Sequence, residues 1–257
     1  MALYSRFLKV LNIMLQKAGL KLVKLPKDQL IPSTLPDEVL YSRPESQYLL
    51  FRPWNSQSLD VWLRKEVTNN TMLSRQKLYY ILSLMEHTLG LEGDVLEAGV
   101  GNGGSARLLL DLIEATKSPK QLWLLDTFEG YKNIHPSKDG THVKTNDCRC
   151  NSLQDVKKLL KSEECRVQFI EGVIPNTLVK VQSQHFSFAH IDVNLYEPTK
   201  TSFEFVLNRL TKGGVIIFDD YNWPATYGAR LAIDEVCAQY KLRPISVPDS
   251  TQAFLIK

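Results

Sequence analysis

The feature that most constrains the fold of this chain is a regular alternation of short apolar runs with amphipathic segments from residue 94 onward. The apolar runs have the length of strands, and the segments between them have the period of helices. We therefore predict strands over 94–99, 121–126, 166–172, 186–192 and 214–220. Helices are expected over 105–116, 153–161, 175–181, 198–210 and 229–239. The alternation is typical of a doubly wound α/β fold, with a mainly parallel sheet and helices on both faces.

The segments on either side of this alternation extend the prediction. Two apolar runs, 243–248 and 252–257, are close enough in sequence to form a hairpin, so we expect an antiparallel edge to the sheet. Residues 24–48 are rich in proline and polar residues and are interpreted as an extended connector. Helical patterns over 56–69 and 73–89 follow the connector.

The first predicted strand runs into a glycine-rich turn over residues 97–105. Its glycines, including Gly99 and Gly101, let the backbone turn sharply and approach a ligand closely. Glu97 stands two positions before the first glycine, where an acid does not help to bind phosphate. A carboxylate there suits the ammonium group of a methionine moiety, reached directly or through water. The alternative is a glycine-rich turn that binds no ligand.

Asp126 ends the second predicted strand, close to where the ribose-binding acid of a dinucleotide-binding unit falls. A carboxylate accepts two hydroxyl hydrogen bonds and therefore holds a ribose well. The alternative is that Asp126 caps the turn over residues 127–130.

Three aspartates end the fourth and fifth predicted strands: Asp192, Asp219 and Asp220. In a doubly wound sheet these strands are neighbours, so the three carboxylates would repel one another and raise each other's pKa. A divalent cation removes that repulsion, and oxygen ligands suit Mg²⁺. Such a metal could orient a substrate hydroxyl and lower its pKa. The alternative is that Asp220 caps the next segment and that one acid is functional.

Motifs over residues 71–235 share one family pattern. They are T-M-x-S (71–74), E-x-G-V-x-x-G-G-S (97–105), D-T-F-E-G (126–130), H-I-D-x-x-L-Y-E-x-T (190–199), G-G-x-I-x-x-D-D-Y (213–221) and G-A-R-x-A-x-D-E (228–235). In order and spacing this chain resembles the macrocin O-methyltransferase, or TylF-type, family. The resemblance implies a Rossmann-like fold, S-adenosylmethionine as methyl donor, Mg²⁺ as metal cofactor and methylation of a sugar hydroxyl on a natural product.

The resemblance also implies roles for single residues. The metal ligands it implies are Asp192, Asp219 and Asp220, with Asp192 also the general base. The cofactor contacts are Thr71, Met72, Glu97, Gly99, Ser105 and Asp126, to which we add Gly101 and Gly172 at strand ends. The chain departs from the family at Val193 and Asn194, where members usually have Gly and Asp, and at Gly101-Asn102 in place of Trp-Arg.

Composition limits the partners. The net charge of +3 is too small to favour nucleic acid, and no segment approaches the roughly 18 apolar residues that span a bilayer. Cys148 and Cys150 are too close for a zinc knuckle, so we expect reduced thiols in a cytoplasmic protein. Residues 1–24 form a basic amphipathic pattern without the features of a signal peptide. Packing on the domain or on a second subunit is favoured over contact with a membrane.

We divide the chain into an N-terminal helical and extended segment, 1–70, with acceptor-site or oligomer contacts, and an S-adenosylmethionine-binding domain, 71–257. Residues 131–151 form a long polar segment that is either a lid over a small-molecule hydroxyl acceptor or a surface insertion. His190 is interpreted as a hydrogen-bonded core residue. The expected function is O-methyl transfer. The alternatives are a non-catalytic cofactor-binding protein and a nucleotide-cofactor dehydrogenase.

Overall fold

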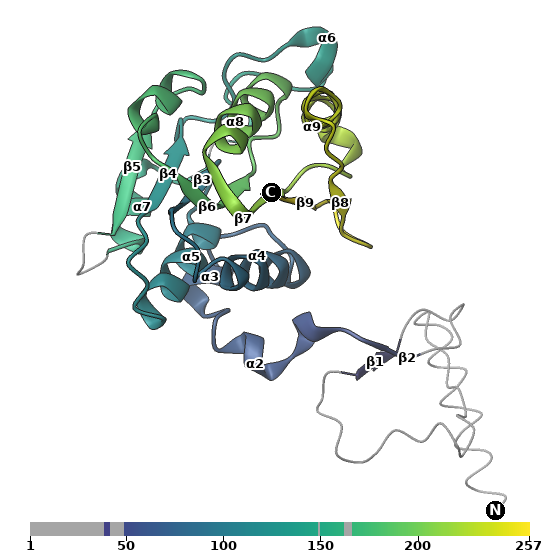
Figure 1. Ribbon diagram of the computed structural model, residues 1–257. Coiled ribbons are helices and arrows are strands. Elements are labelled where there is room, and N and C mark those ends of the chain that lie inside the picture. Colours follow the sequence, from purple (N-terminus) through teal and green to yellow (C-terminus); the bar gives the residue numbers. More distant parts are fainter. Residues whose placement is uncertain (1–38, 42–48, 149, 162–165) are drawn as a thin grey trace, which may run out of the picture. The chain divides into compact units, whose positions relative to one another are not determined.

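The computed structural model describes residues 39–41, 49–148, 150–161 and 166–257, and it divides the chain into two compact units, 1–60 and 61–257 (Figure 1). The basic amphipathic pattern over 1–24 lies outside the described residues. The described elements of the first unit are β1 (Val39–Tyr41), β2 (Leu49–Phe51), η2 (Pro53–Asn55) and α2 (Gln57–Asp60). The strands β1 and β2 pair antiparallel.

The second unit is built on a sheet in which the described residues form seven strands, in the order β5-β4-β3-β6-β7-β9-β8. The strands are β3 (Asp94–Ala98), β4 (Leu122–Asp126), β5 (Val167–Glu171), β6 (Phe186–Ile191), β7 (Leu210–Phe218), β8 (Ile245–Ser246) and β9 (Ala253–Ile256). Strands β3 to β7 are parallel, whereas β9 pairs antiparallel with both β7 and β8. The predicted parallel sheet with an antiparallel edge is confirmed.

Helices cover both faces of this sheet, as the alternation predicts. Figure 1 shows α3, α4 and α5 on one face and α8 and α9 on the other. The helices of this unit are α3 (Lys65–Thr68), α4 (Arg75–His87), α5 (Gly104–Ala115), α6 (Pro136–Asp139), α7 (Leu153–Leu159), η3 (Asn176–Val181), α8 (Tyr196–Arg209), η4 (Pro224–Thr226) and α9 (Tyr227–Tyr240). Within the described residues, no helix has both the length and the apolar character needed to cross a bilayer.

The predicted helix over 56–69 is wrong as a single element, because the chain forms two short helices there, α2 and α3. The residue before α3 is Arg64, whose backbone is extended. Its guanidinium donates to both carboxylate oxygens of Asp111 on α5, at 2.6 Å each. This tertiary contact sets the start of α3 and outweighs the local helical pattern.

The core of the second unit lies between the sheet and its two helix layers. Every residue of β6 is buried, and so are four of the five residues of β3. A strand buried on both faces is expected in a parallel sheet covered by helices. The rigid centre of the fold therefore consists of the strands whose carboxyl ends carry the predicted site residues.

Candidate active site

A cavity of about 580 Å³ opens at the carboxyl ends of the parallel strands. Strand order reverses at β3, which lies between β4 and β6, and ligands of doubly wound sheets bind at such a switch point. The predicted site residues that line this cavity are Thr71, Met72, Gly99, Gly101, Ser105, Asp126, Gly172, Asp192, Asp219 and Asp220.

The glycine-rich turn after β3 makes a backbone contact that other residues would block. Gly99 has a φ of +88°, and a Cβ atom there would lie 1.9 Å from the carbonyl oxygen of Asp192. At Gly104 a Cβ atom would lie 2.6 Å from the carbonyl oxygen of Asn70, which accepts a hydrogen bond from the Gly104 amide. The glycines therefore bring the loops after α3, β3 and β6 together around the cavity.

Glu97 is the predicted cofactor contact that does not line the cavity. Its side chain is fully buried, and its Oε1 atom lies 2.8 Å from Nδ1 of His190 on the neighbouring strand β6. The interpretation of His190 as a hydrogen-bonded core residue therefore agrees with its position. The expected contact of Glu97 with a methionine ammonium stays a prediction, and the structure gives this carboxylate a partner that the sequence did not indicate.

Asp126 ties the end of β4 to the glycine-rich turn. Its Oδ2 atom accepts hydrogen bonds from the amides of Val100 and Gly101, at 2.6 and 3.0 Å. Its Oδ1 atom accepts from the amide of Phe128 at 2.8 Å, which is the turn-capping role considered as the alternative. Because a carboxylate offers about four lone-pair sites, these bonds leave room for a ligand hydroxyl on a side chain that borders the cavity.

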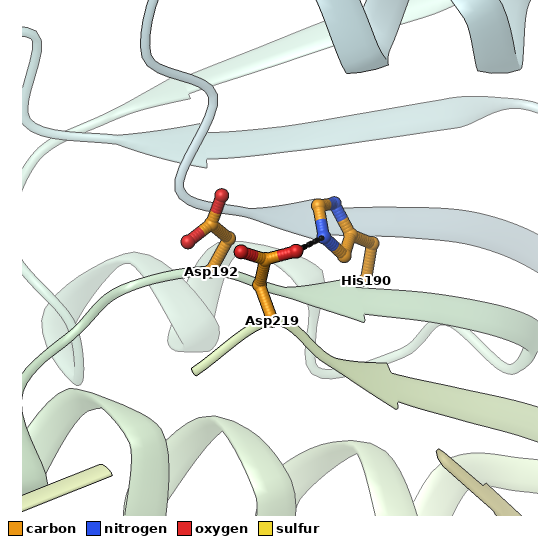
Figure 2. A group of neighbouring side chains, drawn as sticks. All are labelled: His190, Asp192 and Asp219. Carbon is orange, nitrogen blue, oxygen red and sulfur yellow. Dashed lines mark ion pairs between the residues drawn. The ribbon is translucent and has the colours of Figure 1, made fainter. Parts of the chain in front are cut away.

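The strand ends of β6 and β7 form an acidic cluster. Ligand atoms of His190, Asp192 and Asp219 all lie within 4.8 Å of one another. Figure 2 shows the Asp219 carboxylate between the other two side chains, ion-paired with Nε2 of His190 at 3.8 Å. Gln252, which precedes β9, donates to Oδ1 of Asp219 at 2.9 Å, and Lys77 on α4 forms an ion pair with Oδ2.

The carboxyl groups of this cluster titrate differently. Burial, together with the charges of Asp219 and Asp220, raises the pKa of Asp192 well above its ordinary value. Burial and the charge of Asp219 raise the pKa of Asp220 to about 7. Burial and mutual repulsion therefore both disfavour full ionisation of these two carboxyl groups.

Two cations stabilise the charge on Asp219. Burial raises the pKa of this carboxyl, but the imidazolium of His190 and the ammonium of Lys77 outweigh burial and hold the pKa below its ordinary value. Burial lowers the pKa of His190, but contact with Asp219 and Glu97 more than compensates and raises it to about 10. Glu97, His190 and Asp219 therefore form a row of alternating charge from β3 across β6 to the end of β7, where Asp219 lines the cavity.

Asp220 lies outside the group of three and faces the loop after β6. With its amide nitrogen turned toward Asp220, Asn194 donates to both carboxylate oxygens at 3.0 and 3.1 Å. The Asn194 carbonyl then accepts from the hydroxyl of Tyr131 at 3.2 Å. The amide that replaces the usual family acid therefore links Asp220 to the 131–151 segment.

The acidic cluster fits a divalent cation. Asp192 and Asp219 present carboxylate oxygens, which are the ligands that Mg²⁺ and Mn²⁺ prefer. Burial and the nearby charges of Asp219 and Asp220 raise the pKa of Asp192, and a bound cation would offset both effects. Nε2 of His190 pairs with Oδ1 of Asp219, so the imidazole orients this carboxylate.

Lys77 and Gln252 are site residues that sequence reasoning missed. Ser74 caps α4 by accepting a hydrogen bond from the amide of Lys77, which places this lysine in the first helical turn. The capping position of Ser74 in the T-M-x-S motif is a signal from which the start of the helix could have been found. Nothing in the local pattern indicates that Gln252 reaches Asp219.

The 131–151 segment borders the cavity through Tyr131, Lys132, Cys148 and Cys150. It is fixed by Asp139, whose carboxylate accepts from the amides of His135 and Tyr196 at 2.7 and 2.6 Å. Cys148, Cys150 and Cys237 are free thiols. The middle of the segment is thus anchored to the start of α8, while residues near its two ends line the cavity.

The same architecture occurs in a solved structure. The structure of the O-methyltransferase NovP matches with a TM-score of 0.65 and 22% identity, covering 76% of this chain and 88% of that one. A sheet of this order, with a glycine-rich turn and a cavity at the switch point, defines the fold as Rossmann-like.

The family model described as Macrocin-O-methyltransferase (TylF) matches residues 8–256, and the chain belongs to this family. A 4'-O-methyltransferase of 8-demethyl-8-(2,3-dimethoxy-alpha-L-rhamnosyl)-tetracenomycin-C from Streptomyces olivaceus is 26% identical over 72% of this chain and 74% of its own length. Mycinamicin III 3''-O-methyltransferase from Micromonospora griseorubida is 25% identical over 61% of this chain and 66% of its own length. The resemblance inferred from the motifs is confirmed.

Proposed function

We propose that this protein is an S-adenosylmethionine- and Mg²⁺-dependent O-methyltransferase that acts on a hydroxyl of a small molecule, a sugar of a natural product or glycan. The observation that carries the proposal is that the glycine-rich turn, Asp126 and the three aspartates Asp192, Asp219 and Asp220 line one cavity. The names of the two relatives, both methyltransferases of glycosylated natural products, support a sugar acceptor.

The cofactor would lie along the turn after β3. Asp126 would hold the ribose hydroxyls, and the backbone of Gly99 and Gly101 would border the nucleoside. Thr71 and Met72 would border the methionine end, where Thr71 already stabilises its loop by accepting from the amide of Leu73 at 3.0 Å. When bound, S-adenosylmethionine supplies an electrophilic methyl group.

The acceptor would lie next to the acidic cluster. Asp192 and Asp219 would hold the divalent cation, with Asp220 beside them, and a cation there supplies Lewis-acid stabilisation of the acceptor oxygen. Asp192 would take the proton of the acceptor hydroxyl, and the oxygen would attack the methyl carbon in line. The chain contributes mainly position, because the carboxylates are fixed at the ends of buried strands.

The two alternative functions, a dehydrogenase and a non-catalytic binding protein, are each disfavoured by one observation. Membership of a methyltransferase family disfavours a dehydrogenase. A non-catalytic binding protein would have no need for a cluster of buried acids with perturbed pKa values, which are typical of functional sites.

The proposal is tested by calorimetry with S-adenosylhomocysteine and NAD, and by transfer of labelled methyl groups to rhamnosyl and related deoxysugar glycosides, with Mg²⁺ or EDTA. We expect affinity for S-adenosylhomocysteine but not NAD, and turnover that EDTA abolishes. Asp192→Asn should lose turnover and keep cofactor affinity. The control is Asp249→Asn, an exposed aspartate at a positive φ that asparagine tolerates. Absence of affinity for S-adenosylhomocysteine would refute the proposal.

A further inference from the structure

The ion pair between Lys77 and Asp219 is a feature that the proposed reaction does not use. The Lys77 ammonium contacts Oδ2 of Asp219, whose side chain is only 3% exposed, and the lysine side chain itself is 18% exposed. The other oxygen of Asp219 faces Gln252 and His190. The ammonium therefore covers the carboxylate oxygen that is not already held by the fold.

We propose that Lys77 is an internal counter-ion that competes with the divalent cation for Asp219, so that cation binding releases the lysine into the cavity. The inference rests on the proposed function, because it assumes that the acidic cluster holds the cation. It adds a residue that sets the affinity of the site for metal.

The position of Lys77 in α4 supports this role. It lies in the first turn of the helix, three residues after the capping Ser74, where the helix dipole disfavours a positive charge. No acidic residue lies in that first turn to compensate. The ammonium is thus stabilised by Asp219 of the acidic cluster, which lies 142 residues further along the sequence.

Lys77 also has room to leave the cluster. It lines the cavity, together with Asn70 and Ser74 from the same segment and Trp223 from the loop after β7. A lysine carries its charge on a flexible four-carbon stem, so the ammonium can reorient without moving the helix. Released from Asp219, the ammonium would still face the cavity of about 580 Å³.

Competition for one oxygen makes a clear thermodynamic prediction. In the wild-type protein a divalent cation must break the ion pair, so its affinity is reduced by the free energy of that pair. Coupling between two binding events is reciprocal and typically amounts to about 5- to 150-fold in affinity. Removing the ammonium while keeping the stem should therefore tighten cation binding by about tenfold.

The experiment measures Mn²⁺ binding to the full chain by calorimetry and by the electron paramagnetic resonance of free Mn²⁺. Lys77→Met should bind Mn²⁺ about tenfold more tightly than the wild type, whereas Lys77→Arg should keep the wild-type affinity. The control is Lys132→Met, which removes another cavity-lining ammonium that pairs with Glu129 and Asn146, and it should leave Mn²⁺ affinity unchanged.

A second measurement uses the wild-type protein and does not depend on the folding of a variant. Acetylation of Lys77 by an N-hydroxysuccinimide ester, followed by mass spectrometry, should become faster when Mn²⁺ is added, because the freed ammonium is more accessible. Unchanged or weaker Mn²⁺ binding by Lys77→Met, or slower acetylation with Mn²⁺, would overturn the inference and leave the methyltransferase proposal intact. Absence of Mn²⁺ binding by both wild type and Lys77→Met would overturn the inference together with the metal dependence.

Discussion

Replacing His190 tests the buried chain of charges directly. His190 is fully buried between Glu97, at 2.8 Å from Nδ1, and Asp219, at 3.8 Å from Nε2. His190→Ala leaves the Glu97 carboxylate buried without its cation, and breaking a buried pair from one side costs about 3–5 kcal/mol. The cavity left by the imidazole adds to this loss. We therefore expect the free energy of unfolding to fall by at least about 3 kcal/mol.

The pH dependence of this effect has a definite sign. The folded-state pKa of His190, about 10, lies above its unfolded value of 6.5. The stability that the imidazolium contributes is therefore fully present below pH 6.5 and is lost as the pH rises through about 10. The difference in unfolding free energy between wild type and His190→Ala should shrink over that interval.

The assay is urea unfolding in EDTA, followed by circular dichroism at pH 6, 8 and 10. The double variant His190→Ala/Glu97→Gln removes the orphaned charge and should recover part of the loss, which separates electrostatics from packing. His185→Ala, an exposed histidine on the loop before β6, is the control and should leave stability unchanged. A loss below about 1 kcal/mol, or a double variant no more stable than the single one, would refute the reasoning.

Three further predictions concern the cavity. Gly99→Ala should lower stability by about 2 kcal/mol or more, because its Cβ would meet the Asp192 carbonyl at 1.9 Å, and thermal unfolding with and without S-adenosylhomocysteine measures this. An unchanged melting temperature would contradict the geometry. Asp126→Asn should weaken S-adenosylhomocysteine binding about tenfold or more, since it removes the charged acceptor beside the turn; calorimetry that finds equal affinity would argue against the ribose role. Mn²⁺ affinity should rise between pH 6 and pH 8, because the pKa of Asp220 is about 7 and its proton must leave before it can interact with a cation; a flat profile in calorimetry would exclude that contribution.

The architecture and the strand ends were predictable because they follow from local patterns. Alternating strand and helix signals define a parallel sheet, and in such a sheet the carboxyl ends of the strands share an edge. Asp126, Asp192 and Asp219 could therefore be placed at one rim from their positions after apolar runs. The antiparallel edge followed from the short separation between two closing runs of strand residues.

Contacts between elements distant in sequence were not predictable. The partner of Glu97 depends on the register between β3 and β6, which sets Glu97 opposite His190. Lys77 reaches Asp219 because α4 packs against β6 and β7, and this packing is not encoded in the local sequence pattern. The break in the predicted helix over 56–69 depends on Arg64 finding Asp111 on α5. Each of these contacts joins two segments whose local patterns carry no information about one another.

The bonds to Asp219 from the loop before β9 affect when the site can form during synthesis. Gln252 donates to its carboxylate at 2.9 Å, and the hydroxyl of Thr251 donates to its backbone carbonyl at 2.7 Å. A ribosome delivers these two residues only after the glycine-rich turn, α4 and all five parallel strands have emerged. A nascent chain halted before residue 251 would thus contain the glycine-rich turn and Asp126. Its Asp219 would lack the hydrogen bonds from Thr251 and Gln252.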